Sequence, residues 1–172
     1  MAVPAVLIDQ PQIQARITTL AAAIREALPQ DDIHFVCVLK GAFLFLADLV
    51  RAMDARVTLD FIAVSSYGAG TTSSGEVRLV KDVDASLEGR QVVIVEDIVD
   101  TGLTLHYLQD ILRRRGPRSL HTVCLLSKPS RRKVDVAVDF TGFTIDDHFV
   151  VGYGLDLAEK YRNLPYIGVM ED

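Results

Sequence analysis

The stretch VVIVEDIVDTGLT, residues 92–104, carries most of what the sequence predicts about the fold. Its four consecutive aliphatic residues are typical of a strand that is buried on both faces of a parallel sheet. Two adjacent carboxylates, Glu96 and Asp97, follow the strand, and a Thr-Gly-x-Thr turn then opens a helix. A strand, a polar turn and a helix in this order indicate a βα unit of an α/β protein.

The same alternation continues on both sides of this stretch. Helices are expected over residues 13–28, 42–53 and 105–115. Strands are expected over residues 33–39, 57–64, 77–80, 91–95, 120–126 and 134–138, with shorter ones near 82–87, 149–151 and 166–169. The pattern predicts a parallel, doubly wound sheet with helices on both faces. Ligands of such sheets bind outside the carboxyl ends of the strands.

The composition fits one globular domain, because 172 residues, 49% hydrophobic and 24% charged, suffice for a single core. Eighteen basic and 23 acidic side chains give a formal net charge of −5. A net acid does not suit non-specific nucleic-acid binding, so we expect no nucleic-acid partner. The short basic runs at residues 113–115 and 131–133 are interpreted as a solvated helix end and a solvated loop, with subunit contacts or nucleic acid as alternatives.

Neither export nor membrane insertion is predicted. The first residues lack the basic region of a signal peptide and reach Asp9 early. The longest apolar run, residues 42–47, is far shorter than the roughly 20 residues of a membrane helix. Cys37 and Cys124 each lie in an apolar stretch, which predicts two reduced, buried thiols. We therefore expect a cytoplasmic protein.

The polar turn after the strand offers specific chemistry. Backbone amides of residues 101–104 lie at a helix N-terminus, where unpaired N–H groups and the helix dipole attract a phosphate. Glu96 and Asp97 can accept hydrogen bonds from sugar hydroxyls or hold a hydrated Mg²⁺, and Asp100 is free to take a proton. In the alternative interpretation, Asp100 or Thr101 merely caps the helix. The turn matches neither the Walker A nor the Rossmann glycine pattern.

The whole segment resembles the ribose-phosphate signature of the type I phosphoribosyltransferases, and in particular the hypoxanthine(-guanine) phosphoribosyltransferases. The similarity extends in order and spacing over nearly all of the chain after Asp31. The matching motifs are LKGA at 39–42, SYG at 66–68, SK at 127–128, FVVGYGLD at 149–156 and RNLPYIG at 162–168. The 149–156 motif points to the branch that uses 6-oxopurines.

The resemblance implies the family reaction, in which 5-phosphoribosyl 1-pyrophosphate and a 6-oxopurine give a nucleotide and pyrophosphate, with Mg²⁺ as cofactor. Asp100 would take the N7 proton of the base while N9 attacks the anomeric carbon. Glu96 and Asp97 would face the ribose hydroxyls. The 5′-phosphate would be held by four consecutive residues of the turn, Thr101, Gly102, Leu103 and Thr104.

Pyrophosphate and metal sites are implied elsewhere in the chain. Lys40 and Gly41 would bind pyrophosphate through their backbone, and Arg162 through its side chain. Asp156 would bind one Mg²⁺, and the two adjacent carboxylates of the signature complete the implied metal set. Leu157 is a departure, since many relatives carry an aromatic residue there.

Base recognition is implied at three further positions. Lys128 would donate to the base oxygen O6, Phe149 would stack on the purine, and the backbone of Val150 would contact the edge of the base. Ser66 and Tyr67 would lie on a polar loop, residues 65–76, that closes over the site.

Each of these positions also has a simpler interpretation. Lys128 suits a protein surface, Phe149 suits core packing, and Lys40 with Gly41 suits the end of a strand. Asp156 suits the cap of a helix that begins near Ala158.

The fold implied by the resemblance is the type I phosphoribosyltransferase fold. The single domain would span residues 1–172, with a core at about 31–140 and a small hood from about 141–172 together with the N-terminal segment. A homodimer or homotetramer is implied as well. Two functional alternatives stay open: an RNA-binding regulator of the same fold, and a transferase that prefers xanthine or adenine. The order of preference between hypoxanthine and guanine is also open.

Overall fold

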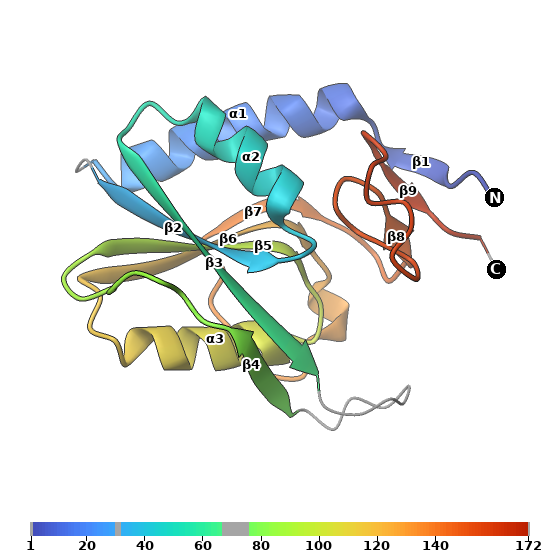
Figure 1. The fold of residues 1–172 in the computed structure, drawn as a ribbon. Helices are drawn as coiled ribbons and strands as arrows, with labels where there is room; N and C mark the ends of the chain where they lie inside the picture. Colours follow the sequence, from blue (N-terminus) through green and yellow to red (C-terminus); the bar gives the residue numbers. More distant parts are fainter. Residues whose placement is uncertain (1, 30–31, 67–75, 172) are drawn as a thin grey trace.

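A six-stranded sheet forms the centre of the protein in a computed structural model that describes residues 2–29, 32–66 and 76–171 (Figure 1). The strand order is β4-β3-β2-β5-β6-β7, and all neighbours are parallel except the antiparallel pair of β3 with the edge strand β4. The strands are β2 (Ile33–Leu39), β3 (Val57–Ser66), β4 (Val77–Lys81), β5 (Gln91–Val99), β6 (Ser119–Ser127) and β7 (Phe140–Thr144).

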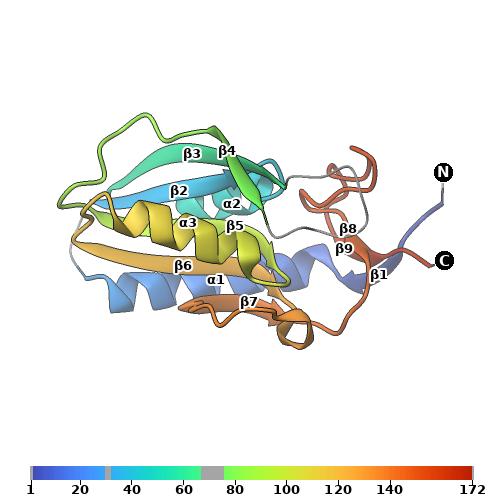
Figure 2. The same cartoon turned by 90° about the horizontal axis from the view of Figure 1, so that it is seen from below.

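Helices cover both faces of this sheet, as Figure 2 shows with α3 across one face and α1 and α2 behind the strands. The helices are α1 (Gln10–Ala27), α2 (Phe43–Ala52) and α3 (Leu103–Arg113). Alternate residues of β2 serve the two layers: Phe35 and Cys37 pack with α1 and α2, whereas Val36 and Val38 pack with α3. Because both faces are buried, β2 is apolar at nearly every position, as expected for a central parallel strand. The predicted fold class is confirmed.

A second, three-stranded sheet joins the two ends of the chain. Its antiparallel order is β1-β9-β8, with β1 at Ala5–Ile8, β8 at Val150–Val151 and β9 at Ile167–Val169. Figure 1 shows it beside the end of the large sheet toward which β2 and β3 point. The carboxyl ends of the central strands therefore face this small sheet.

One predicted strand is wrong. Within the described range 76–171, residues 134–138 form no strand, and β7 begins only at Phe140. The alternation of valines arises because Val136 and Val138 pack against the core on the α3 side. The backbone beside them has side-chain partners: the Gln109 amide nitrogen donates to the Ala137 carbonyl over 2.8 Å. The apolar alternation thus reflects burial without strand pairing.

The observed elements differ from the prediction in four further places. Residues 82–87 form no strand, since the backbone amides of Asp84 and Ala85 instead donate to the buried Asp60 carboxylate, each over 2.9 Å. β5 continues to Val99, so Glu96 and Asp97 lie inside the strand. No helix begins near Ala158, where three residues have positive φ. Finally, β1 had no counterpart in the predicted elements.

Two expectations about burial and the membrane have structural counterparts. Cys37 and Cys124 are both buried, as predicted. Among the described residues, the helices are too short or too polar to cross a bilayer.

Candidate active site

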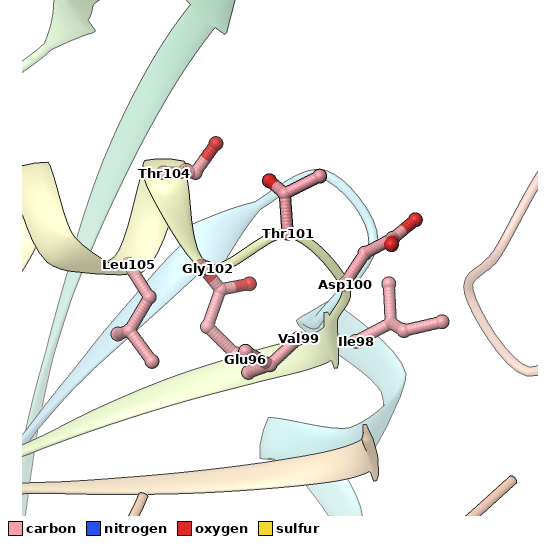
Figure 3. A pocket seen from close by; sticks show the side chains of 8 residues that line it. All are labelled: Glu96, Ile98, Val99, Asp100, Thr101, Gly102, Thr104 and Leu105. Atoms are coloured by element: carbon pink, nitrogen blue, oxygen red, sulfur yellow. The ribbon is translucent and has the colours of Figure 1, made fainter. Parts of the chain in front are cut away.

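The turn between β5 and α3 forms a pocket at the carboxyl end of the central sheet. Its lining consists of Glu96, Ile98, Val99, Asp100, Thr101, Gly102, Thr104 and Leu105. Figure 3 shows the Glu96 side chain rising from β5 toward the turn, while the Asp100 carboxylate points away from α3. The Leu103 amide donates to the Thr101 hydroxyl over 3.3 Å, which shapes the first turn of the helix. The helix N-terminus and two threonine hydroxyls give this pocket the chemistry of a phosphate site.

Gly102 is the N-cap of α3 and has φ +84°, a conformation that residues with a Cβ rarely adopt. A Cβ at this position would lie 2.9 Å from Val136 Cγ1 and 3.5 Å from Arg132 Cδ. Glycine is therefore favoured here for two reasons: the positive φ, and the side chains of the 132–136 segment that fill the space behind the turn.

Glu96 and Asp97 form a pair of adjacent carboxyls, the first buried and the second partly buried. Glu96 is only 6% exposed, and burial, followed by the charge of Asp97, raises its pKa well above the ordinary value. Burial also raises the pKa of Asp97, against the opposing effect of the Ile98 amide, which donates to Asp97 Oδ1 over 2.7 Å. Two adjacent carboxyls with restricted access to water repel each other when both are ionised, and a bound cation relieves this repulsion. Their oxygens therefore suit a divalent cation or sugar hydroxyls as ligands.

The turn after β2 packs directly on this pair. A Cβ at Gly41 would collide with Asp97 Oδ2, so only glycine leaves room for the carboxylate. The Leu39–Lys40 peptide bond that precedes it is cis. From the small-sheet side, a Cβ at Gly154 would collide with the Gly41 carbonyl oxygen. The chain segments that hold Gly41, Asp97 and Gly154 are therefore in close contact.

Arg162 and its partners lie on the same side of the site. Arg162 Nη1 donates to the Gly154 carbonyl over 2.7 Å, and Nη2 lies 3.4 Å from Asp156 Oδ1 and 3.1 Å from Glu159 Oε1. Glu159 also pairs with Lys40 over 3.1 Å. Arg162 Nε is buried without a hydrogen-bond partner among the described residues. A buried, unpartnered N–H donor on a guanidinium suits an anionic ligand.

Asp156 caps a turn, not a helix. Its Oδ2 accepts the Glu159 amide over 2.8 Å. Within the described residues, no three His, Cys, Asp or Glu side chains converge as a metal cluster. One or two carboxylates still suit Mg²⁺, which usually completes its shell with water and substrate phosphates. Asp156 and the adjacent carboxyls of Glu96 and Asp97 are of this kind.

A row of alternating charges connects the ends of β5 and β6. Arg131 Nε donates to Asp100 Oδ1 over 2.9 Å, and Arg131 Nη1 lies 3.4 Å from Asp147 Oδ2. Asp147 Oδ1 lies 3.6 Å from Lys128 Nζ. The Lys128 side chain is 8% exposed, so its interpretation as a surface lysine is wrong. Val99 and Ser127, which precede Asp100 and Lys128, are partners in the sheet, and the Lys128 amide donates to the Val99 carbonyl over 2.9 Å.

Two of the three predicted base-contact residues, Phe149 and Val150, lie at the start of β8 in the small sheet. Phe149 is 54% exposed, which contradicts its interpretation as core packing. Val150 opens β8 and is buried, with its backbone paired to Val169 of β9. Ser66 is the last residue of β3, whereas Tyr67 lies outside the described residues, as does most of the predicted closing loop.

Four charged residues of this site were absent from the predicted set: Arg131, Arg132, Asp147 and Glu159. The basic run 131–133 was interpreted as solvated, yet Arg132 donates to the carbonyls of Val99 and Asp100 over 2.8 and 2.9 Å. A signal was present: Pro129 follows Lys128 and starts a short 3₁₀ turn (Pro129–Arg131) that folds the run back toward β5. The sequence around Asp147 gave no such signal.

Comparison with known proteins identifies the class to which this site belongs. The family model of the phosphoribosyl transferase domain matches residues 6–158. The chain therefore belongs to the phosphoribosyl transferase family.

Individual relatives narrow this class. The chain is 51% identical to the hypoxanthine-guanine phosphoribosyltransferase of Bacillus subtilis over 166 residues, covering 96% of this chain and 92% of that protein. It is 48% identical to the hypoxanthine phosphoribosyltransferase of Haemophilus influenzae, covering 95% and 93%. A crystal structure of a hypoxanthine-guanine phosphoribosyltransferase from Bacillus anthracis superposes with a TM-score of 0.95 at 46% identity, covering 99% of this chain and 100% of that one. These relatives place the chain in the hypoxanthine(-guanine) branch of the family.

Proposed function

We propose that this protein is a purine-salvage enzyme that transfers the 5-phosphoribosyl group from 5-phosphoribosyl 1-pyrophosphate to hypoxanthine, guanine or both. The products are IMP or GMP and pyrophosphate. One observation carries this proposal: Asp100 and Lys128 extend from adjacent, hydrogen-bonded strand ends. A 6-oxopurine carries N7 and O6 on one edge, so a proton acceptor and a donor side by side match that edge.

The sugar donor binds along the β5–α3 turn. Amides and hydroxyls of residues 101–104 hold the 5′-phosphate at the N-terminus of α3. Glu96 and Asp97 accept hydrogen bonds from the ribose hydroxyls. The pyrophosphate lies between the Lys40–Gly41 backbone and Arg162, whose buried Nε supplies an unused donor among the described residues.

Mg²⁺ is the proposed cofactor: Asp156 would bind one ion, and Glu96 and Asp97 offer a second pair of carboxyls where an ion would bind together with substrate oxygens. When bound, it neutralises the negative charge that develops on the leaving pyrophosphate. Arg162 supplies further positive charge on the same side of the site.

The reaction follows from these placements. The bond between N9 and the anomeric carbon forms as the bond from that carbon to pyrophosphate oxygen breaks, and its electron pair leaves with pyrophosphate. The N7 proton of the base passes to Asp100, which acts as the general base. Phe149 stacks on the purine, and the Val150 backbone contacts its edge. The small sheet acts as the hood.

We further propose a cytoplasmic homodimer or homotetramer that acts without a nucleic-acid partner. The named relatives favour neither the RNA-binding alternative nor an enzyme directed at xanthine or adenine.

The testing experiment measures nucleotide formation from hypoxanthine, guanine, xanthine and adenine, each with the same sugar donor and Mg²⁺. Turnover of hypoxanthine or guanine supports the proposal. Equal or faster turnover of adenine or xanthine contradicts it, as does salt-sensitive RNA binding without turnover of any base.

A further inference from the structure

Arg132 makes four hydrogen bonds that join the segments carrying Asp100 and Lys128. Nη1 donates to the carbonyls of Val99, Asp100 and Lys128 over 2.8, 2.9 and 3.3 Å. Nη2 donates to the hydroxyl of Ser127, the last residue of β6, over 2.8 Å. One guanidinium thus spans the ends of two neighbouring strands.

We propose that Arg132 is a positioning residue that fixes Asp100 and Lys128 relative to each other, and so sets how the N7–O6 edge of the purine is held. This inference rests on the proposed function. Asp100 and Lys128 contact neighbouring atoms, N7 and O6, of one rigid base, but they follow different strands. An error in their separation therefore weakens both contacts at once.

The chemistry of this position requires arginine. A planar guanidinium presents several donors in a fixed fork, whereas a lysine ammonium is a point charge on a flexible stem. The neighbouring Arg131 differs, because its partners are the carboxylates of Asp100 and Asp147 and its side chain is 46% exposed. Of these two arginines, Arg132 is the one that binds the backbone carrying the site.

The turn at residues 101–104, here called the phosphate turn, has hydrogen bonds of its own. The Lys133 amide donates to the Thr101 carbonyl and the His106 amide to the Gly102 carbonyl, both over 2.9 Å. Arg132 approaches this turn with its aliphatic Cδ, which lies close to Gly102. Arg132→Lys keeps that methylene and removes the fork. The substitution should therefore harm binding of the base more than binding of the sugar donor.

The first experiment compares the steady-state kinetics of Arg132→Lys with those of the unaltered protein. We expect kcat/KM for hypoxanthine to fall roughly 10–100-fold, as for a misplacement of catalytic groups by about 1 Å. KM for the sugar donor should stay within about twofold, since ground-state contacts to it are retained. Arg114→Lys is the matched control, because exposed Arg114 pairs only with Asp110 on α3 among the described residues, and its kinetics should not change.

A double-mutant cycle separates positioning from a general structural role. On an Asp100→Asn background the fixed geometry no longer serves proton transfer, so Arg132→Lys should reduce kcat/KM by much less than on the wild-type background. Equal losses on both backgrounds would overturn the positioning role. So would equal losses for base and sugar donor accompanied by a lower unfolding temperature.

Ser127→Ala provides a milder variant that keeps the arginine. It removes one acceptor of the guanidinium from a buried position that is 4% exposed. The same selective loss for the base, at smaller size, is expected, and unchanged kinetics in both Ser127→Ala and Arg132→Lys would overturn the inference. If the unaltered protein turns over neither hypoxanthine nor guanine, the proposed function itself fails, which is a separate result.

Discussion

Arg131 and Asp100 form an ion pair in which Arg131 Nε donates to Asp100 Oδ1 over 2.9 Å. The proposed proton acceptor is therefore already oriented by a cation in the free protein. Both side chains are substantially exposed, at 46% and 39%, so water screens the pair. Such a screened pair orients the Asp100 carboxylate and still allows the N7–H group of the purine to replace Arg131 as its partner.

Replacing Asp100 by Asn should remove the basic oxygen while keeping the shape of the side chain. General-base contributions are on the order of 10²–10⁴-fold, so we expect kcat to fall by that range. KM for the sugar donor should change little, because the phosphate turn is retained. Steady-state kinetics check this, with Asp110→Asn on the exposed face of α3 as control. Activity near wild type would remove Asp100 from the mechanism.

Gly102→Ala should both destabilise the protein and raise KM for the sugar donor. A Cβ there is strained by φ +84° and meets Val136 Cγ1 at 2.9 Å. Gly89→Ala is the matched control, because Gly89 has φ +69° and a methyl group there would meet no atom of the described residues within 4 Å beyond its chain neighbours. We expect Gly89→Ala to cost about 1 kcal/mol of unfolding free energy and Gly102→Ala more. Equal unfolding energies and an unchanged KM would refute the packing argument.

Lys128→Ala should reduce turnover of hypoxanthine and narrow its advantage over adenine. The ammonium has no acceptor capacity, so it suits the carbonyl oxygen of a 6-oxopurine and opposes the amino group of adenine. With adenine, Lys128 would keep Asp147, 3.6 Å away, as its ionic partner but would lose the acceptor that O6 supplies. A buried donor that loses its hydrogen-bond acceptor costs about 1–3 kcal/mol, which is the basis of the selectivity. Competition assays with both bases check this.

Phe149→Ala serves as the comparison for Lys128→Ala. Stacking on an exposed aromatic ring contributes affinity for any purine, so all bases should weaken alike. A wild-type enzyme that used adenine as well as hypoxanthine would contradict the role of Lys128.

Asp156→Ala should raise the Mg²⁺ concentration required for half-maximal rate. The same carboxylate accepts the Glu159 amide, so loss of the turn and loss of a metal ligand must be separated. Asp156→Asn keeps an oxygen acceptor for that amide but is a weaker ligand for a hard cation. If both variants shift the Mg²⁺ dependence, the role is metal binding; if only Asp156→Ala has any effect, the role is the turn.

Cys37 and Cys124 should resist thiol reagents in the folded protein. Burial raises the pKa of both thiols to about 12, so neither forms a thiolate at neutral pH. In the unfolded chain the pKa of both thiols returns to the ordinary value of 9.0, so the stability that they contribute declines as the pH rises from that value toward 12. A colorimetric thiol titration at neutral pH, with and without denaturant, checks this. Fast modification of the native protein would contradict it.

The βα units and most of the candidate site residues were predictable from the sequence, because each is encoded in contiguous residues. The aliphatic run before Glu96 requires a buried strand, and the glycine after Thr101 permits the left-handed residue that begins α3. Local propensity and burial act over a few residues, and so they are readable without knowledge of the fold.

Which of these residues meet became clear only in three dimensions. Gly41 contacts Asp97 because β2 and β5 are neighbours in the sheet, and Gly154 contacts Gly41 because the chain end returns to the site. The 134–138 segment was predicted as a strand and forms none. Its apolar alternation indicates burial, but strand pairing also requires a neighbouring strand, which the alternation does not reveal. Arg132 looked like one solvated charge among three until the β5 and β6 carbonyls came within reach. Such contacts depend on which strands are neighbours in the sheet and on where the C-terminal segment packs. Both are determined by residues that lie far apart in the sequence.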